Sequence, residues 1–257
     1  MRVSVVVPTY NGESVITETL IRLQSRLTNN DEVIVVVNGS TDRTFERATD
    51  FATNTIGVGP AIRITKSKKG LGCAYQSGVL EAKGQFIVLT ADDLPFGFSD
   101  WESVSELTQP SAIAIGSKAH KQSKVQRSFL RSLLSRIFLL TRRILLKSRV
   151  GDTQGTFFLQ GEWVKDFARK TTVADYMWTT YLVSYAETRG LVPIEVPVNL
   201  DQSHGDHGTR IGIVDILQSF VSLVTLRKHI KNWSKELKPG LPITIELENF
   251  PILDSYK

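Results

Sequence analysis

Short apolar runs rich in valine and isoleucine alternate with helix-like segments through the first third of this chain. The runs cover residues 3–7, 32–37, 61–65 and 86–89, and the helix-like segments cover residues 14–27, 41–52 and 71–83. Helices of this length between short β-branched strands predict right-handed crossovers and a mostly parallel sheet flanked by helices. The sequence therefore predicts an α/β fold, in which ligands bind at the carboxyl ends of the strands.

Polar and aromatic residues follow the predicted strands where such a fold binds its ligands. Tyr10 and Glu13 come after the first run, and Asn38 and Ser40 come after the second. The tyrosine ring can stack on a base, while Glu13 or Asn38 could hydrogen-bond to base or ribose edges. Each residue alone also suits a turn or a helix N-cap, so the predicted nucleotide site depends on several loops sharing one edge.

Two adjacent carboxylates, Asp92 and Asp93, follow the run at residues 86–89. Mg²⁺ prefers one or two carboxylates plus substrate phosphates over a cage built wholly from protein ligands. Neighbouring acids after a strand also form turns and cap helices, and this alternative stays open for the pair by itself. Beside the nucleotide-binding loops, we expect the pair to hold Mg²⁺ or Mn²⁺ on a diphosphate.

The composition of the 257 residues, 41% hydrophobic and 22% charged, fits one large α/β domain. No segment reaches the roughly 18 uncharged apolar residues that a membrane-spanning helix needs. The single cysteine, Cys73, excludes an intramolecular disulfide, and the N-terminus lacks a secretory-signal pattern, so a cytoplasmic location is expected. His204 and His207 suit a solvent-exposed loop better than a zinc site.

Positive charge gathers in the second half of the chain, although the net charge is only +5. Ten Lys and Arg residues and no Asp or Glu occur between Leu107 and Gly151. This stretch contains a helix-like segment with apolar residues spaced three and four apart. They are Phe129, Leu130, Leu133, Leu134, Ile137, Leu140 and Ile144, while Arg127, Arg131, Arg142 and Lys147 are expected over the remaining surface.

Two interpretations of this amphipathic basic helix stay open. Its apolar stripe packs against the sheet, as in an ordinary surface helix, or it lies on an anionic membrane surface. No aromatic-rich groove or nucleic-acid motif accompanies the charge, which argues against nucleic acid as a partner.

Three stretches together resemble the N-terminal half of family 2 glycosyltransferases with the GT-A fold, which has a Rossmann-like nucleotide-binding half. They are Val5-Val6-Val7-Pro8-Thr9-Tyr10-Asn11-Gly12-Glu13, Val35-Val36-Val37-Asn38-Gly39-Ser40-Thr41-Asp42 and Gly70-Leu71-Gly72-Cys73-Ala74. The resemblance implies a nucleotide-sugar donor and a D-x-D motif that binds the metal. Here Asn38 replaces an acid of the usual pair and Ala91 replaces the first acid of D-x-D, which leaves Asp93 as the matched ligand and Asp92 as a substitute.

Further along, the order of motifs resembles the polyprenyl-phosphate sugar transferases, the dolichyl-phosphate mannose and glucose synthase group of family 2. Gly116-Ser117-Lys118, the basic helix and Asp152-Thr153-Gln154 match the family order G-S-R, basic helix, D-T-Q-C-G-F-K, whereas the residues from Gly155 depart from it. Residues 190–198 resemble the following strand, and residues 205–210 occupy the place of a flexible loop that carries a basic residue toward phosphate.

The resemblance, which covers about residues 3–230, implies a GT-A domain at 1–236 with a nucleotide-sugar-binding half (1–116) and an acceptor half (117–236). A C-terminal tail at 237–257 is compatible with an edge strand, self-association into a homo-oligomer, or loose chain. The implied nucleotide-binding residues are Pro8, Tyr10, Asn11, Glu13, Asn38, Ser40 and Gly70. The implied phosphate- and acceptor-binding residues are Lys118, Arg127, Arg131, Asp152 and Gln154, with Arg210 closing over the catalytic aspartates Asp92 and Asp93.

Many family 2 enzymes that glycosylate hydroxyls carry an acidic base at the start of a late helix, where this chain has Thr179, with Asp175 a turn earlier. A phosphate acceptor needs no base because it is already an anion. The resemblance thus implies inverting transfer of a sugar to a polyprenyl phosphate, by an enzyme attached peripherally to the inner face of a membrane. Two alternatives stay open: transfer to a hydroxyl of a soluble metabolite or glycan with Asp175 as base, and a non-catalytic module that binds nucleotide or membrane.

Overall fold

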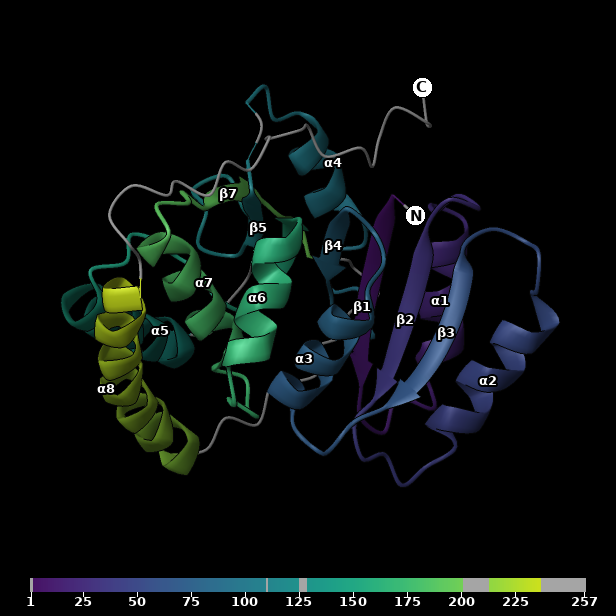
Figure 1. Cartoon of the computed structure of the whole chain (residues 1–257), viewed down its shortest axis with the longest axis horizontal. Coiled ribbons are helices and arrows are strands. Elements are labelled where there is room, and N and C mark those ends of the chain that lie inside the picture. Colours follow the sequence, from purple (N-terminus) through teal and green to yellow (C-terminus); the bar gives the residue numbers. More distant parts are fainter. Residues whose placement is uncertain (1, 110, 125–128, 201–212, 237–257) are drawn as a thin grey trace.

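The structure is a computed structural model that describes residues 2–109, 111–124, 129–200 and 213–236. Its strands are β1 (Val3–Thr9), β2 (Glu32–Val37), β3 (Ala61–Lys66), β4 (Phe86–Leu89), β5 (Ile113–Ser117), β6 (Thr156–Gln160) and β7 (Ile194–Pro197). Its helices are α1 (Ile16–Gln24), α2 (Thr44–Asn54), α3 (Leu71–Glu81), α4 (Ser99–Ser105), α5 (Phe129–Leu146), α6 (Glu162–Lys170), α7 (Trp178–Thr188) and α8 (Ile213–Glu236). The strands form one sheet in the order β3-β2-β1-β4-β6-β5-β7, with helices on both faces (Figure 1).

The first four strands confirm the predicted parallel α/β sheet. β1 pairs in parallel with both β2 and β4, and β2 pairs in parallel with β3. The chain moves outward from β1 to β3 and then returns through α3 to place β4 on the other side of β1. The connections after β1 and β4 therefore leave the sheet in opposite directions, and such a switch point opens a crevice for ligands.

The rest of the chain completes the sheet with one reversed strand. Within the described part, β6 runs antiparallel to β4 and β5, whereas β5 and β7 are parallel. β1 to β5 and β7 therefore all point the same way, and the loop before β6 meets the loops after the other strands. This topology brings Asp92, Lys118 and Gln154 to one edge of the sheet, although they are far apart in sequence.

Alternate residues of the central strands belong to opposite faces of the sheet. Val6, Ile34 and Leu89 pack into a core with α3, α6 and α7, while Val5, Val33 and Val88 pack into a second core with α1 and α4. Every residue of β1 and β2 is buried. Strands covered on both faces by helices need apolar side chains on both, which explains the near-continuous valine runs in the sequence.

Helix α5 exposes part of the apolar stripe that the sequence defines. Ile137, Leu140 and Ile144 are 46%, 60% and 68% exposed. The expectation that Arg142 lies on the remaining surface was wrong: it is buried, and its guanidinium donates to the Val150 carbonyl oxygen. Burial lowers the pKa of Arg142, and the charges of Asp152, Glu187 and Glu195 oppose this effect. The helix thus turns its charged Arg142 inward and leaves apolar residues in contact with solvent.

Helix α8 packs against α5 and α7 through one face. Leu223, Leu226 and Trp233 are buried, and the Trp233 ring lies 5.1 Å from that of Tyr185 in α7, nearly perpendicular to it. Val221 and Val224 lie on the exposed side. None of the helices in the described ranges combines the length and hydropathy that crossing a membrane requires.

Asp100, at the start of α4, gives the stability of the fold a testable pH dependence. Its side chain is buried, and this burial raises its pKa to about 6 despite hydrogen bonds from Thr156 and the Trp101 amide. A raised folded-state pKa means that ionisation destabilises the fold as the pH rises through 6, by at most about 3 kcal/mol. We expect Asp100→Asn to increase the free energy of unfolding at pH 8 but not at pH 4, as measured by urea denaturation. An equal gain at both pH values would contradict this account.

Candidate active site

Asp92 lies in the crevice between β1 and β4 and is held there by two threonines. Thr9, the last residue of β1, donates a hydrogen bond from Oγ1 to Asp92 Oδ2 at 2.6 Å. Thr19 of α1 donates from its hydroxyl to the Asp92 carbonyl oxygen. Burial raises the pKa of Asp92 to about 6; the neighbouring charge of Asp93 adds to this shift, while the Thr9 hydrogen bond opposes it. A bound cation would remove the cost of keeping both carboxylates charged.

Gly12 allows the loop after β1 to approach this aspartate. A Cβ atom at Gly12 would lie 2.3 Å from Thr9 Oγ1 and 2.7 Å from Asp92 Oδ2, too close for any side chain. The backbone of the loop therefore lies directly over the Thr9–Asp92 pair.

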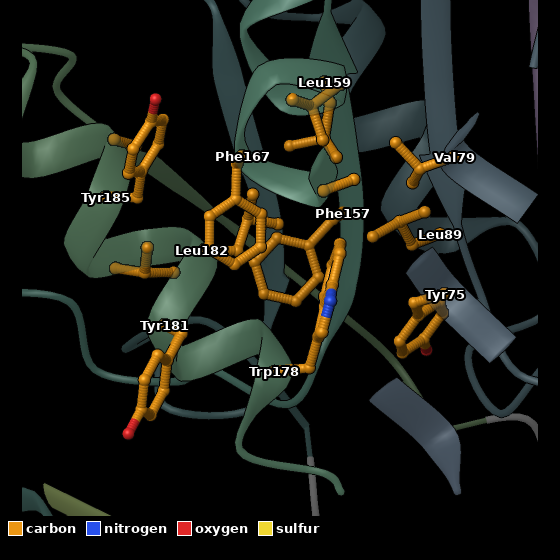
Figure 2. Packing of buried hydrophobic residues seen from close by; sticks show 14 of the residues in the cluster. Tyr75, Val79, Leu89, Phe157, Leu159, Phe167, Trp178, Tyr181, Leu182 and Tyr185 are labelled. Atoms are coloured by element: carbon orange, nitrogen blue, oxygen red, sulfur yellow. The ribbon is translucent and has the colours of Figure 1, made fainter. Parts of the chain in front are cut away.

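An aromatic cluster supports the acidic loop from one side of the sheet. The Trp178 ring lies between Tyr75 and Phe167, with centroid distances of 5.6 Å and 4.9 Å (Figure 2). The buried Tyr75 hydroxyl donates to the Thr90 carbonyl oxygen at 3.4 Å. Its pKa is raised by burial and then by the charges of Asp92 and Asp93. Packing of α3 and α7 thus fixes the backbone from which the acidic pair extends.

The predicted nucleotide-binding loops after β1 and β2 are joined by hydrogen bonds. The backbone amide of Asn11 donates to Ser40 Oγ at 3.0 Å. The side-chain oxygen of Asn11, Oδ1, accepts from the backbone amide of Thr41 at 2.9 Å. The Glu13 carboxylate accepts from the Arg43 amide at 3.3 Å and pairs with Arg47 Nε at 3.2 Å. The Glu13 side chain therefore links the two loops, and contact with a base or ribose edge stays a prediction.

The other candidate nucleotide residues occupy different environments. Pro8 lies within β1 opposite Val36, where its fixed φ suits an extended strand, and its contact with nucleotide stays a prediction. Asn38 is buried, and its backbone amide donates to the Thr9 carbonyl oxygen at 3.0 Å. Tyr10 is 45% exposed, and Lys69 Nζ lies 3.1 Å from its hydroxyl and 4.6 Å from its ring centroid.

Gly70 lies against the segment that precedes α7. Its φ of +129° and a Cβ position 2.3 Å from the Ala174 carbonyl oxygen exclude a side chain. The Gly72 amide donates to the same oxygen at 2.8 Å. The start of α3 is thus fastened to the start of α7, which brings the two halves of the site together.

Lys118, Asp152 and Gln154, which the resemblance assigns to phosphate or acceptor binding, lie close to one another. Asp152 Oδ2 accepts from the backbone amide of Lys118 at 2.9 Å, and Asp152 Oδ1 accepts from the backbone amide of Gln154 at 2.8 Å. Lys118 Nζ lies 3.5 Å from the Gln154 carbonyl oxygen and 5.9 Å from the centroid of the Phe96 ring, beside the acidic loop. Asp152 therefore orders the backbone, while Lys118 supplies a positive charge.

Gln154 also reaches the start of α7. Its Nε2 donates to the Tyr176 carbonyl oxygen and to Thr179 Oγ1, both at 3.0 Å. Thr179 is buried, so the position compared with a catalytic base carries a neutral hydroxyl engaged in hydrogen bonds. The exposed Asp175 lies before α7, and its Oδ1 accepts from the backbone amide of Met177 at 2.8 Å.

Three candidate phosphate-binding arginines are not placed in detail. Arg127 and Arg210 lie outside the described residues, and Arg131 lies in α5 at a position whose side chain is not described. Their predicted roles stay predictions, as does that of the tail at 237–257.

The acidic pair fits a divalent cation that shares its coordination with a ligand. No group of three or more His, Cys, Asp or Glu residues that could hold a metal occurs in the described part of the chain. Two carboxylates without a third such ligand suit Mg²⁺ or Mn²⁺ bound jointly by protein and diphosphate oxygens, rather than a metal enclosed by protein. Asp93 and Asp92 would hold the ion.

The sheet order, its switch point and the acidic pair define a GT-A glycosyltransferase. The model of the family described as glycosyl transferase family 2 matches residues 4–164, and the chain belongs to this family.

Relatives by sequence point to one group within the family. A protein of Trichomonas vaginalis named dolichyl-phosphate beta-glucosyltransferase ALG5C is 29% identical to this chain. The alignment covers 93% of this chain and 75% of that protein. The dolichol-phosphate mannosyltransferase of Pyrococcus furiosus is 36% identical over 57% of this chain, and the human dolichyl-phosphate beta-glucosyltransferase is 33% identical over 62%. The chain spans only 42% and 54% of the lengths of these two relatives.

Solved structures confirm the fold. Glucosyl-3-phosphoglycerate synthase from Mycobacterium tuberculosis in complex with Mg²⁺ and UDP superimposes with a TM-score of 0.63 at 17% identity, over 88% of this chain and 79% of that one. The complex of the same enzyme with Mn²⁺, UDP-glucose and phosphoglyceric acid gives a TM-score of 0.62 at 16% identity, over 90% and 80% of the chains.

Proposed function

We propose that this protein transfers a sugar from a nucleoside diphosphate sugar to a polyprenyl phosphate such as dolichyl phosphate. The observation that carries the acceptor class is Thr179, a buried hydroxyl bound to Gln154 where an acidic base would be needed for a hydroxyl acceptor. A phosphate monoester is an anion at neutral pH and attacks without losing a proton to the enzyme. The names of the sequence relatives support the same acceptor.

The described residues divide the chemistry between two sides of the crevice. On the donor side, Asp93 and Asp92 would hold Mg²⁺ or Mn²⁺, which neutralises the diphosphate as it leaves. Thr9 and Thr19 keep Asp92 oriented for this task. On the acceptor side, Lys118 attracts the acceptor phosphate. A phosphate oxygen then forms the new bond to the anomeric carbon while the bond to the diphosphate oxygen breaks, with the inversion that the family implies.

The exposed faces of α5 and α8 suit a membrane surface, where the acceptor lipid resides. Leu140 and Ile144 of α5 and Val221 of α8 are 60%, 68% and 67% exposed. Exposed basic residues accompany them: Arg143 on α5, Lys147 directly after it, and Arg227, Lys228 and Lys231 on α8. Apolar side chains enter the boundary between headgroups and acyl chains, and each cation near anionic headgroups adds about 1 kcal/mol. Peripheral attachment to an anionic inner leaflet follows as part of the proposal.

The double substitution Leu140→Ser and Ile144→Ser is expected to weaken binding to vesicles of phosphatidylcholine with phosphatidylserine. Withdrawing both apolar side chains from the lipid should reduce the partition constant about tenfold or more, because each buried Leu or Ile contributes about 1.5–3 kcal/mol. Vesicle flotation measures this constant. The control pair, Ile56→Ser and Val58→Ser, alters residues that are 79% and 61% exposed between α2 and β3, and binding should be unchanged. Equal binding of both double variants would contradict a membrane role for α5.

One assay tests the proposed function directly. The purified protein is incubated with nucleotide sugars, short polyprenyl phosphates and Mn²⁺, and the lipid fraction is analysed for attached sugar. Sugar-charged lipid is expected, and Asp175→Asn should leave its formation unchanged, because a phosphate acceptor needs no base and this carboxylate accepts from the Met177 backbone amide. Transfer only to a soluble alcohol, lost in Asp175→Asn, would favour the hydroxyl acceptor. No transfer to any acceptor, with nucleotide binding retained, would favour the non-catalytic module.

A further inference from the structure

Glu195 of β7 connects three separate parts of the acceptor side. Its Oε2 accepts from the Gly151 amide at 2.7 Å and its Oε1 from the Asp152 amide at 3.0 Å. The Ser117 hydroxyl, at the end of β5, also donates to Oε1. One carboxylate therefore joins β7, the end of β5 and the loop before β6.

The loop that Glu195 holds determines where the acceptor-side groups lie. Asp152 accepts from the Lys118 amide, and the Gln154 side chain reaches Thr179. The Lys118 side chain also contacts this loop, through a hydrogen bond from Nζ to the Gln154 carbonyl oxygen. Glu195 touches neither Lys118 nor the Gln154 side chain in any of these contacts, so it acts on both through the backbone of residues 151–154.

The site requires a carboxylate rather than an amide. Glu195 offers two acceptor oxygens to three donors, whereas glutamine would present an N–H group toward one of the two amides. The buried Arg142 guanidinium donates to the Val150 carbonyl oxygen, just before the loop, and the charge of Glu195 helps to keep that guanidinium protonated. A neutral residue would leave one amide without its acceptor and reduce the negative charge around Arg142.

Space around Gly151 is consistent with this role. A Cβ atom at Gly151 would lie 3.1 Å and 3.2 Å from the two Glu195 oxygens and 2.9 Å from the Ala119 Cβ. The carboxylate thus lies against a backbone that has no side chain, which allows it to bind two consecutive amides.

We infer that Glu195 is a positioning residue for sugar transfer, which sets the geometry of Lys118 and Gln154 toward the acceptor without contacting either substrate. The inference depends on the proposed function for the identity of the acceptor. It predicts that loss of the carboxylate affects the acceptor side while nucleotide binding persists.

The test uses Glu195→Gln in the full chain, with Glu187→Gln as the matched control. Glu187 also lies near Arg142, but its carboxylate accepts from the Ser148 hydroxyl and the Arg149 backbone rather than from the backbone of residues 151–154. We expect Glu195→Gln to raise the KM for polyprenyl phosphate or lower kcat, with a loss of about tenfold or more in kcat/KM, as expected for a hydrogen bond to a charged group. Calorimetric binding of UDP or GDP with Mn²⁺ should stay within about twofold. Glu187→Gln should retain the acceptor kinetics of the unaltered protein.

Two further measurements separate positioning from general damage. A double variant with Glu195→Gln and Lys118→Ala should lose less acceptor kcat/KM than the product of the two single losses, because both residues act on the same acceptor geometry. Hydrogen exchange of the Gly151 and Asp152 amides should become about tenfold faster in Glu195→Gln and stay unchanged in Glu187→Gln.

The outcomes distinguish this inference from the proposed function. Unchanged exchange at Gly151 and Asp152, or an unchanged acceptor kcat/KM in an active protein, would overturn the positioning role alone. Absence of lipid glycosylation by the unaltered protein would overturn the proposed function, and hydrogen exchange would still decide whether Glu195 holds the loop.

Discussion

Replacing Asp93 with asparagine is expected to reduce sugar transfer by about a thousandfold, the loss typical of removing one preorganised electrostatic contact from a transition state. The carboxylate lies in the loop that leaves β4, beside the half-buried Asp92, and is the matched ligand of the D-x-D motif. An amide keeps the shape of the side chain but not the charge that binds the cation. Steady-state transfer assays across a range of Mn²⁺ concentrations measure the effect, and high Mn²⁺ should restore part of the activity.

A readout independent of turnover accompanies this variant. Calorimetry should show that Asp93→Asn loses the Mn²⁺-dependent part of UDP or GDP binding, while the melting temperature stays close to that of the unaltered protein. Asp50→Ala, which removes an exposed carboxylate from α2, should alter neither quantity. Full activity of Asp93→Asn would show that the acidic pair is a structural turn.

The sequence predicted the first half of the fold well because its signal is local. The valine runs of β1 and β2 are apolar on both faces, as strands covered by helices must be, and the segments between them have helical length. The position of β6 in the sheet could not be predicted, since no pattern within Thr156–Gln160 indicates that this strand lies antiparallel between β4 and β5. Strand order depends on contacts between distant residues, which local periodicity does not encode.

The candidate site was predictable where a motif ends a strand and less so where residues support one another. Asp92, Lys118 and Gln154 lie at the expected edge because six strands point the same way. The roles of Thr19 and Glu195 were missed, since a hydroxyl within a helix and a carboxylate within a strand carry no signal of their partners 73 and 43 or more residues away. Thr9, directly after the valine run of β1, was the one supporting residue whose position gave a clue.

The direction of Arg142 shows a limit of helical periodicity. Spacing placed its side chain away from the stripe of Ile137, Leu140 and Ile144, and that relative placement is correct. The error lay in which face meets solvent: a carbonyl oxygen and three nearby carboxylates draw Arg142 inward. Periodicity defines the faces of a helix, and tertiary electrostatics decides which one is buried.

The substitution Gly155→Ala is expected to destabilise the protein by about 3 kcal/mol and to reduce transfer about 100-fold. A Cβ atom at Gly155 would lie 1.8 Å from the Gly116 carbonyl oxygen and 2.9 Å from its carbon. Both are backbone atoms of β5, so no side chain can yield, and the loop carrying Gln154 must move away from the strand. Chemical denaturation and acceptor kinetics measure the two losses. The family pattern shows a cysteine in this register, yet this backbone leaves room only for glycine.

Gly161→Ala separates this collision from the general cost of adding a methyl group. Gly161, at the other end of β6, has a φ of +74°, and nothing lies within 4 Å of its Cβ position. With a ψ of −166° this backbone conformation is open almost only to glycine, so alanine there should cost about 1–3 kcal/mol through backbone strain and leave transfer unchanged. Gly155 has no such positive φ, so the loss of stability and of transfer in Gly155→Ala must come from the contact with Gly116. If both variants lost the same stability and Gly155→Ala kept full transfer, the close approach of β5 would not be what places Gln154.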